Sequence, residues 1–147
     1  MTYSFGIRSH NKKITCHKDL QLILDKAIKI IDFSILEGAR TLETQQKYFA
    51  EGKSKVDGVN VKSKHQVSHN QPLSLAVDIA PYPIYWDDSF KFAFLAGVMK
   101  SVATNLLEQN KITHQLRWGG DWNSNNNFKD QTFFDLSHFE LVKFKYE

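Results

Sequence analysis

The longest regular pattern in this chain is a run of apolar residues that begins at Phe90 and keeps three- and four-residue steps until about Gln109. This spacing places the apolar side chains on one face of a helix. Asp87 or Asp88 stands where a carboxylate can cap the first turn. We therefore expect a helix at the centre of the packing, with an apolar face formed by Phe90, Phe94, Leu95, Val98, Met99, Val102, Leu106 and Leu107.

A second stripe predicts another helix that faces the core. Between His17 and Ile31 the apolar residues again recur at helical spacing. Residues 33–36 then have the composition of a short strand, which ends at Gly38. The stripe of this helix consists of Leu20, Ile23, Leu24, Ala27, Ile28 and Ile31.

A third helix and a long loop follow. Thr41 is placed to cap a helix that runs to about Glu51, and Gly52 is a suitable stop. Residues 53–73 are polar and have no sustained period, so they predict a long excursion without regular structure. Loops of this length are often functional.

The remaining segments predict strands. Residues 75–80 are strand-like and are followed by two prolines, which would place Asp78 and Ala76 on one face of the strand. Residues 115–118 and 138–142 are further strand candidates. We expect an α+β fold in which residues 1–147 form a single small domain, an antiparallel sheet flanked by about three helices.

Composition limits the class of protein. A length of 147 residues suits one domain, and a hydrophobic share of 41% excludes disorder. The single cysteine, Cys16, excludes an internal disulfide and is expected to be buried or half-buried. The first residues lack the pattern of a signal peptide, and no apolar stretch reaches the ~18 residues of a membrane span, so we expect the product to start in the cytoplasm.

Three separated fragments contain metal-ligating residue types. A histidine-rich stretch surrounds His65, and Asp78 and His138 each lie on a predicted strand bounded by loops. Two imidazoles and one carboxylate, with a fourth position left for water, form a recurring catalytic zinc site. Taken singly, each residue is equally compatible with an ordinary surface or supporting role, so the prediction depends on the combination.

Four ordered motifs carry a family resemblance: Ser63-Lys64-His65, residues 76–82, residues 117–122 and residues 135–141. They resemble the phage endolysins and bacterial enzymes of the L-alanyl-D-glutamate peptidase group. This group belongs with the VanY-like D-alanyl-D-alanine carboxypeptidases and shares a zinc-site fold with Hedgehog signalling domains. The resemblance extends from about Phe5 to Val142.

The resemblance implies a Zn²⁺ ion held by His65, Asp78 and His138. It also implies that an acidic residue three positions before the last ligand, here Asp135, is the general base. Arg40 lies in a segment that looks like the family's Gly-x-Arg-Thr motif. The resemblance implies that its guanidinium binds or polarises the substrate carbonyl, which makes Arg40 the oxyanion candidate.

The first histidine ligand has two candidates. In the simplest members of the group it lies seven residues before the aspartate, where this chain has Gln71, so the loop carries extra residues. His65 has the matching Ser-Lys-His context, whereas His69 is closer to Asp78 and also follows a serine. We favour His65 and keep His69 as the alternative.

The role of Asp135 requires a particular backbone. Residues three apart on a straight strand point to opposite faces, so Asp135-Leu136-Ser137 must form a turn that leads into the strand of His138. Glu140 follows His138 by two residues and shares its face. It is a rival base, although a supporting role that orients an imidazole is the better interpretation.

Other conspicuous residues are compatible with either a functional or a structural role. Trp118, Trp122, Tyr82 and Tyr85 could line a groove, but aromatic residues are more often core. Asp121 and the run Asn123 to Asn127 could hold a calcium ion, but the run itself has no carboxylate, so we expect a solvated loop. No partner is identifiable for His10, His17 and His114, which are interpreted as structural.

Together these expectations describe a zinc peptidase that cuts the peptidoglycan stem peptide, between L-alanine and D-glutamate as the resemblance implies. We expect a monomer without stable membrane association that accumulates in the host cytoplasm and reaches the wall during phage-induced lysis. The alternatives are a D-alanyl-D-alanine carboxypeptidase or dipeptidase, and a catalytically silent zinc module that binds the wall. A nucleic-acid binder would rest on the net charge of +3 alone.

Overall fold

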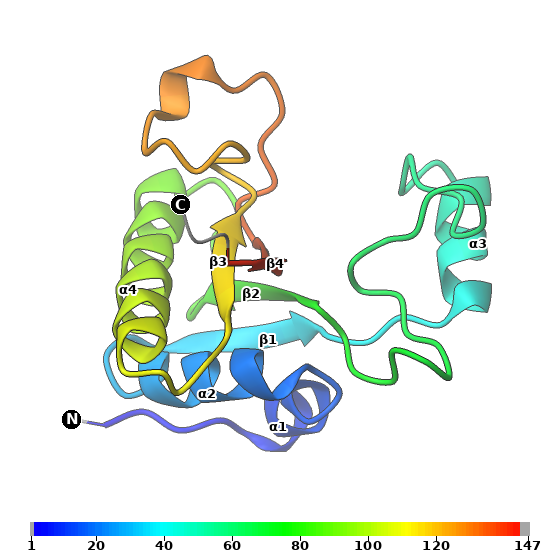
Figure 1. Ribbon diagram of the computed structural model, residues 1–147. Helices are drawn as coiled ribbons and strands as arrows, with labels where there is room; N and C mark the ends of the chain where they lie inside the picture. The colour runs from blue at the N-terminus through cyan, green and yellow to red at the C-terminus, as the bar shows by residue number, and fades with distance from the viewer. Residues whose placement is uncertain (1, 145–147) are drawn as a thin grey trace.

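The computed structural model describes residues 2–144, which form one four-stranded sheet with helices around it (Figure 1). The strands are β1 (Phe33–Glu37), β2 (Ala76–Pro81), β3 (His114–Trp118) and β4 (His138–Lys143), in the spatial order β1-β2-β4-β3. All three pairings are antiparallel. The expected α+β class and its antiparallel sheet are confirmed.

Within residues 2–144, four α-helices accompany the sheet, rather than about three. They are α1 (Ile7–Lys13), α2 (Lys18–Ala27), α3 (Leu42–Ala50) and α4 (Ser89–Glu108), and a single 3-10 turn, η1, spans Phe128–Asp130. The additional helix is α1. None of its residues is buried, so it has no apolar stripe from which it could have been predicted.

The predicted caps of α3 and α4 are confirmed by their hydrogen bonds, whereas the helix expected between His17 and Ile31 ends earlier, at Ala27. The Asp88 carboxylate accepts a hydrogen bond from the backbone amide of Lys91 at the start of α4. The Thr41 hydroxyl accepts one from the amide of Thr44 at the start of α3. Gly52, with φ of 75°, follows the end of α3 in the left-handed conformation that glycine adopts at little cost.

The apolar face assigned to α4 is partly wrong. Phe90 and Phe94 are exposed, Phe90 almost completely. They lie about half a turn away from the buried stripe, because each residue advances about 100° around a helix. The buried stripe is Phe92, Leu95, Ala96, Met99, Val102, Ala103 and Leu106.

Helix α4 also departs from the expectation about membrane spans. By length and composition it could cross a membrane, with a mean hydropathy of 1.2. Its apolar character is explained in part by the core, since it packs against α2, β2 and β3. The expectation that no segment would reach this length was therefore too strict.

The core lies on one face of the sheet. Alternate strand residues point into it, among them Val77 and Ile79 of β2 and Phe139 and Leu141 of β4, all essentially inaccessible to solvent. Cys16 is fully buried in the same cluster, as expected.

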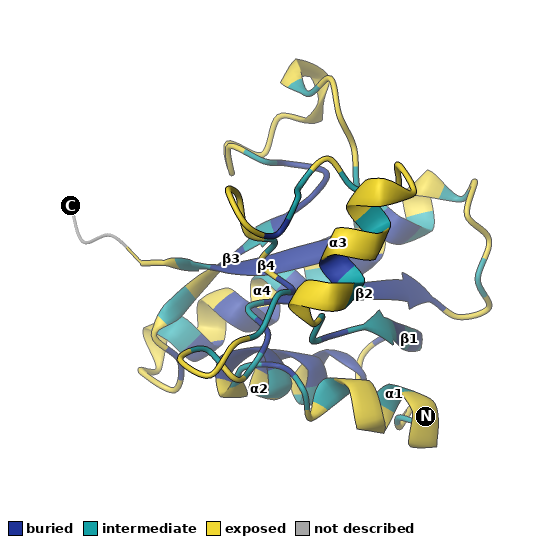
Figure 2. Ribbon diagram, turned by 90° about the vertical axis from the view of Figure 1, so that its right-hand side faces the viewer, coloured by how far each residue is buried: buried dark blue, intermediate teal, exposed yellow. Residues whose placement is uncertain are grey.

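The other face of the sheet points toward α3 and the long loop of residues 53–73. Figures 1 and 2 show α3 and this loop on the side of the sheet opposite α4, and most of α3 is exposed. The loop contains no helix or strand, as predicted. The second face of the sheet is therefore the place where polar side chains from β2 and β4 can meet residues of the loop.

Candidate metal centre

Strand register places the polar residues of the sheet on one face. Asp78 of β2 is the direct partner of His138 of β4, and Arg117 of β3 is the direct partner of Glu140. Directly paired residues in an antiparallel ladder project to the same side. The side chains of these four residues therefore meet on the face opposite the core.

Three donor atoms converge on this face. The Oδ1 atom of Asp78 lies 3.3 Å from Nε2 of His65 and 3.2 Å from Nδ1 of His138, and the two imidazole nitrogens lie 3.3 Å apart. Ligands at the ~2.0–2.1 Å distances usual for zinc, arranged tetrahedrally, are separated by about 3.3 Å. The three donors thus fit one tetrahedral ion and leave its fourth position open.

His65 is oriented for this role by the backbone. Its side chain is 3% exposed, and Nδ1 donates a hydrogen bond of 2.8 Å to the carbonyl oxygen of Gly38. A carbonyl can only accept, so Nδ1 carries the proton and the Nε2 lone pair faces Asp78. The segment is fixed by backbone bonds from the Arg40 amide to the His65 carbonyl and from the Val67 amide to the Arg40 carbonyl.

The alternative histidine is elsewhere. His69 is exposed and belongs to none of the described groups of residues whose donor atoms converge. The structure therefore brings His65, and not His69, together with Asp78 and His138. Their role as metal ligands stays a prediction.

His138 is held from its other side by Glu140. Nε2 of His138 donates to the Glu140 carboxylate at 2.9 Å, and Arg117 donates to the same carboxylate at 2.7 Å. This contact agrees with the supporting role expected for Glu140. Burial alone would lower the pKa of His138, but hydrogen bonds to Asp78 and Glu140 outweigh it and raise the pKa to about 9. Burial likewise opposes ionisation of Asp78, yet the two histidines hold its pKa well below the usual range.

Asp135 precedes the strand in a turn, as its predicted role required. Its carbonyl accepts a hydrogen bond from the His138 amide, and its own amide donates to the carbonyl of Gly119. The hydroxyl of Ser137 donates to its carboxylate at 3.2 Å. Burial raises the pKa of Asp135, and the nearby charge of Asp78 adds to that effect. A carboxyl with a raised pKa suits proton transfer near neutral pH.

Arg40 is fixed by partners from the end of β1 and from α3. Its Nε and Nη2 atoms donate to the two carboxylate oxygens of Glu37 at 2.8 and 2.9 Å, and Nη1 donates to the side chain of Gln45 at 2.8 Å. The guanidinium also lies over the ring of Tyr48, 4.8 Å from its centroid. These bonds fix the orientation of the group, and its role toward a substrate carbonyl stays a prediction.

The aromatic candidates separate into three environments. Trp118 is a core residue, 4% exposed. The ring of Trp122 lies 5.6 Å from the ring of His138, so Trp122 borders the candidate centre. Tyr82 and Tyr85 are exposed. The interpretation of these residues as core is therefore correct only for Trp118.

The asparagine-rich loop is organised by its own hydrogen bonds. The buried Asp121 carboxylate accepts from the backbone amides of Asn125 and Asn126, and Lys100 lies 3.5 Å from it. Side-chain amides of the loop donate to Asp130. The two carboxylates that could have bound calcium thus already have partners.

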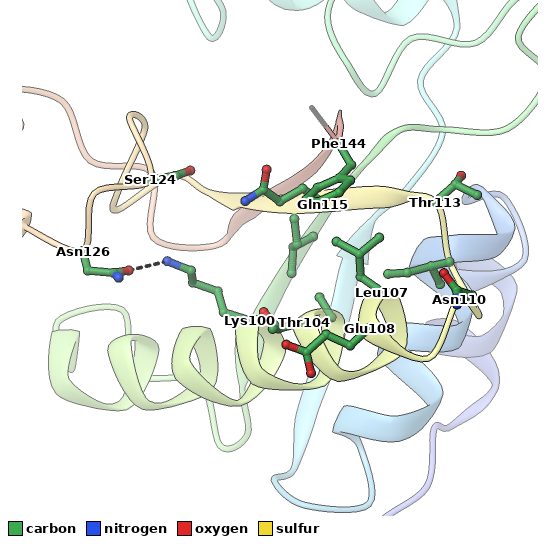
Figure 3. Close-up of a pocket in the computed structure, with 13 residues that line it drawn as sticks. Lys100, Thr104, Leu107, Glu108, Asn110, Thr113, Gln115, Ser124, Asn126 and Phe144 are labelled. Carbon is green, nitrogen blue, oxygen red and sulfur yellow. Dashed lines mark hydrogen bonds between the residues drawn. The ribbon is translucent and has the colours of Figure 1, made fainter. Parts of the chain in front are cut away.

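A cavity of about 690 Å³ lies between α4 and β3, away from this centre (Figure 3). Lys100, Thr104 and Gln115 are among the residues that line it, and Lys100 donates a hydrogen bond of 2.8 Å to Asn126 at its rim. None of its lining residues belongs to the group of His65, Asp78 and His138. The cavity is therefore separate from the candidate centre.

Comparison with known proteins identifies the family. The family model for phage L-alanyl-D-glutamate peptidase matches residues 1–142. The chain belongs to this peptidase family. A search of curated proteins gave no match. The match covers the segments that hold His65, Asp78, Asp135 and His138, so the family resemblance inferred from the sequence motifs is confirmed.

A solved structure has the same fold as this chain. The L-Ala D-Glu endopeptidase ChiX of Serratia marcescens aligns with a TM-score of 0.68 and 23% sequence identity. The alignment covers 94% of this chain and 89% of the Serratia chain. At this identity the likeness shows a shared fold, and the chemistry of this chain has to be argued from its own residues.

Proposed function

We propose that this phage L-alanyl-D-glutamate peptidase is a zinc hydrolase that cuts the bond between L-alanine and D-glutamate in the peptidoglycan stem peptide. The observation that carries the proposal is the triangle of donor atoms from His65, Asp78 and His138, with sides of 3.2 to 3.3 Å. Two imidazoles and one carboxylate form a donor set typical of catalytic zinc.

The residues around the triangle supply the other parts of a hydrolysis. Bound zinc would lower the pKa of a water to about 7 and polarise the scissile carbonyl. Asp135 would accept the proton of that water and deliver it to the departing amine of D-glutamate. Arg40, held by Glu37 and Gln45, would orient the substrate carbonyl. Glu140 would keep His138 in the tautomer whose Nδ1 lone pair faces the ion.

The biological role that we propose is lysis of the host cell. The enzyme would accumulate in the host cytoplasm, as a monomer, and act on the wall after the membrane has been permeabilised. Membership of a phage peptidase family supports this role.

Digestion of purified peptidoglycan tests the proposed bond. Mass spectrometry should detect fragments with a new amino group on D-glutamate, whereas a D-alanyl-D-alanine carboxypeptidase or dipeptidase would release only D-alanine. Asp135→Ala should abolish the new amine. A silent wall-binding module would bind the wall equally well with or without this substitution and would release no fragment, and that result would refute the proposed hydrolysis.

A further inference from the structure

A second cluster of histidine and carboxylate side chains lies where α2 meets β3. His17 caps the first turn of α2 and Asp19 lies within that turn, while His114 begins β3. The structure gives partners to these two histidines, for which the sequence offered none. Nδ1 of His114 lies 2.8 Å from Oδ2 of Asp19, Nδ1 of His17 lies 3.9 Å from Oδ1 of the same carboxylate, and the two rings are 4.9 Å apart.

One donor atom from each of these three residues lies within 4.8 Å of the other two. Ligands on a tetrahedral zinc ion are separated by about 3.3 Å, so the side chains would have to adjust on binding to complete the geometry. Nδ1 of His17 accepts the capping bond from the Asp19 amide and Nδ1 of His114 is bonded to the Asp19 carboxylate, so the Nε2 atoms are the nitrogens left for an ion. Both imidazoles are about a quarter exposed, so an ion can reach them from solvent.

The carboxylate of this cluster is fixed and ionised. Asp19 is buried, and Oδ2 accepts hydrogen bonds from the backbone amides of Thr113 and His114. Burial raises the pKa of Asp19, but the bonds from His114 and Thr113 outweigh it, so the pKa lies below the usual range. The two backbone amides converge on Oδ2, whereas Oδ1 lies 3.9 Å from Nδ1 of His17 and is the oxygen that faces a cation between the two rings.

We propose that His17, Asp19 and His114 bind a second divalent transition-metal ion of the zinc class, separate from the peptidase centre. Imidazole nitrogens favour zinc, nickel or copper over magnesium or calcium. The ion would link the first turn of α2 to the first residue of β3, which are 95 positions apart in the chain. Solvent would complete its coordination, and its binding would be weaker than at the more buried centre.

Zinc binding by four proteins tests this proposal: the wild type, His65→Ala, His17→Asn and the double variant. Asparagine retains a helix-capping side chain at position 17 while removing the imidazole. Equilibrium dialysis against zinc with elemental analysis measures the ions bound per chain. The proposal predicts about two ions for the wild type, about one for each single variant and none for the double variant, since each site requires its own imidazoles.

The number of zinc ions bound by each of the four proteins distinguishes the proposal for the peptidase centre from the proposal for the second site. If the peptidase centre bound no zinc but the second site did, only the proteins with His17 would bind an ion. If the second site did not exist, His17→Asn would bind as much zinc as the wild type, and that equality would overturn the present proposal. His10→Ala, which removes an exposed histidine outside both clusters, is the control for unspecific binding.

Activity and stability provide a second readout. His17→Asn should leave peptidase activity unchanged, because its cluster shares no residue with the peptidase centre. Zinc above the amount that saturates the first site should raise the unfolding temperature of the wild type further, and this additional rise should be absent in His17→Asn and in Asp19→Asn. An equal rise in all three proteins would contradict a site at this cluster.

Discussion

Glu140 accepts a hydrogen bond from Nε2 of His138, the residue two positions earlier on the same strand, so the strand that supplies a proposed ligand also supplies its orienting group. Glu140→Gln retains the size of the side chain but removes the charge that stabilises this tautomer of His138. We expect zinc affinity to fall about 10- to 100-fold with the fold retained. Competition with a chromophoric chelator measures the change.

The control for that substitution is Glu108→Gln, which alters an exposed glutamate at the end of α4. Its zinc affinity should equal that of the wild type. Equal affinities for Glu140→Gln and Glu108→Gln would show that Glu140 does not support the metal.

His65→Ala and His69→Ala distinguish the two histidines of the long loop. Because Nε2 of His65 lies 3.3 Å from Oδ1 of Asp78, its replacement should abolish zinc binding at the peptidase centre together with activity. His69→Ala should retain both, since that side chain is exposed. Elemental analysis and peptidoglycan digestion provide the comparison, and the reverse pattern would assign the ligand to His69.

Asp135→Asn tests the proposed general base without changing the size of the side chain. We expect kcat to fall by roughly 10² to 10⁴, the usual contribution of a positioned acid or base, while bound zinc is unchanged. Asp87→Asn, at an exposed aspartate before α4, should retain full activity. If Asp135→Asn retained the kcat of the wild type, another group would have to be the general base, and Glu140 would be the first candidate.

The histidine–aspartate contact predicts opposite pH dependences with and without metal. The folded protein raises the pKa of His138 from 6.5 to about 9, so in the metal-free protein its stabilising contribution is complete below pH 6.5 and is lost as the pH rises to about 9. Zinc must displace that proton, so zinc binding strengthens over the same interval. Unfolding temperatures of the two forms at several pH values should diverge, and a metal-free form that gains stability over this interval would refute the assignment.

Gly119 determines where Asp135 can lie. A Cβ at this position would collide with the carbonyl of Asp135 and stand 3.0 Å from its Cβ. Gly119→Ala should therefore displace Asp135, reduce activity and cost on the order of 1–3 kcal/mol of stability. Gly97→Ala is the matched control, because its Cβ would meet open space in the middle of α4 and should stabilise the helix by about 1 kcal/mol. Enzyme assays and denaturant unfolding of both variants test this contrast.

The sequence predicted the features that depend on local chemistry. Thr41 and Asp88 were recognisable as caps because capping requires a particular side chain at a particular position. The stripe from Leu20 to Ile31 was recognisable from its spacing and is buried throughout, although Ile28 and Ile31 lie beyond the end of α2. In α4 both sides carry apolar residues, so periodicity alone could not show that Phe92 is buried while Phe90 is exposed.

The candidate site was also predictable only in part, because some of its contacts depend on how the elements pack and not on spacing within the chain. Motifs identified Asp78 and His138, and strand register then placed them opposite each other. The contact of Asp19 with His114 depends on how α2 packs beside β3, which no spacing in the chain reveals. The same is true of the ion pair between Arg117 and Glu140, which results from the register of β3 on β4.

The order of the strands in the sheet determines which of them separate first when the folded protein opens locally. Asp78 and His138 belong to β2 and β4, the two interior strands, whereas β1 and β3 form the edges. Local opening begins at edges and termini, and strands paired on both sides open last. Amide protons of β2 and β4 should therefore exchange most slowly, and chelation followed by remetallation should proceed without a refolding phase.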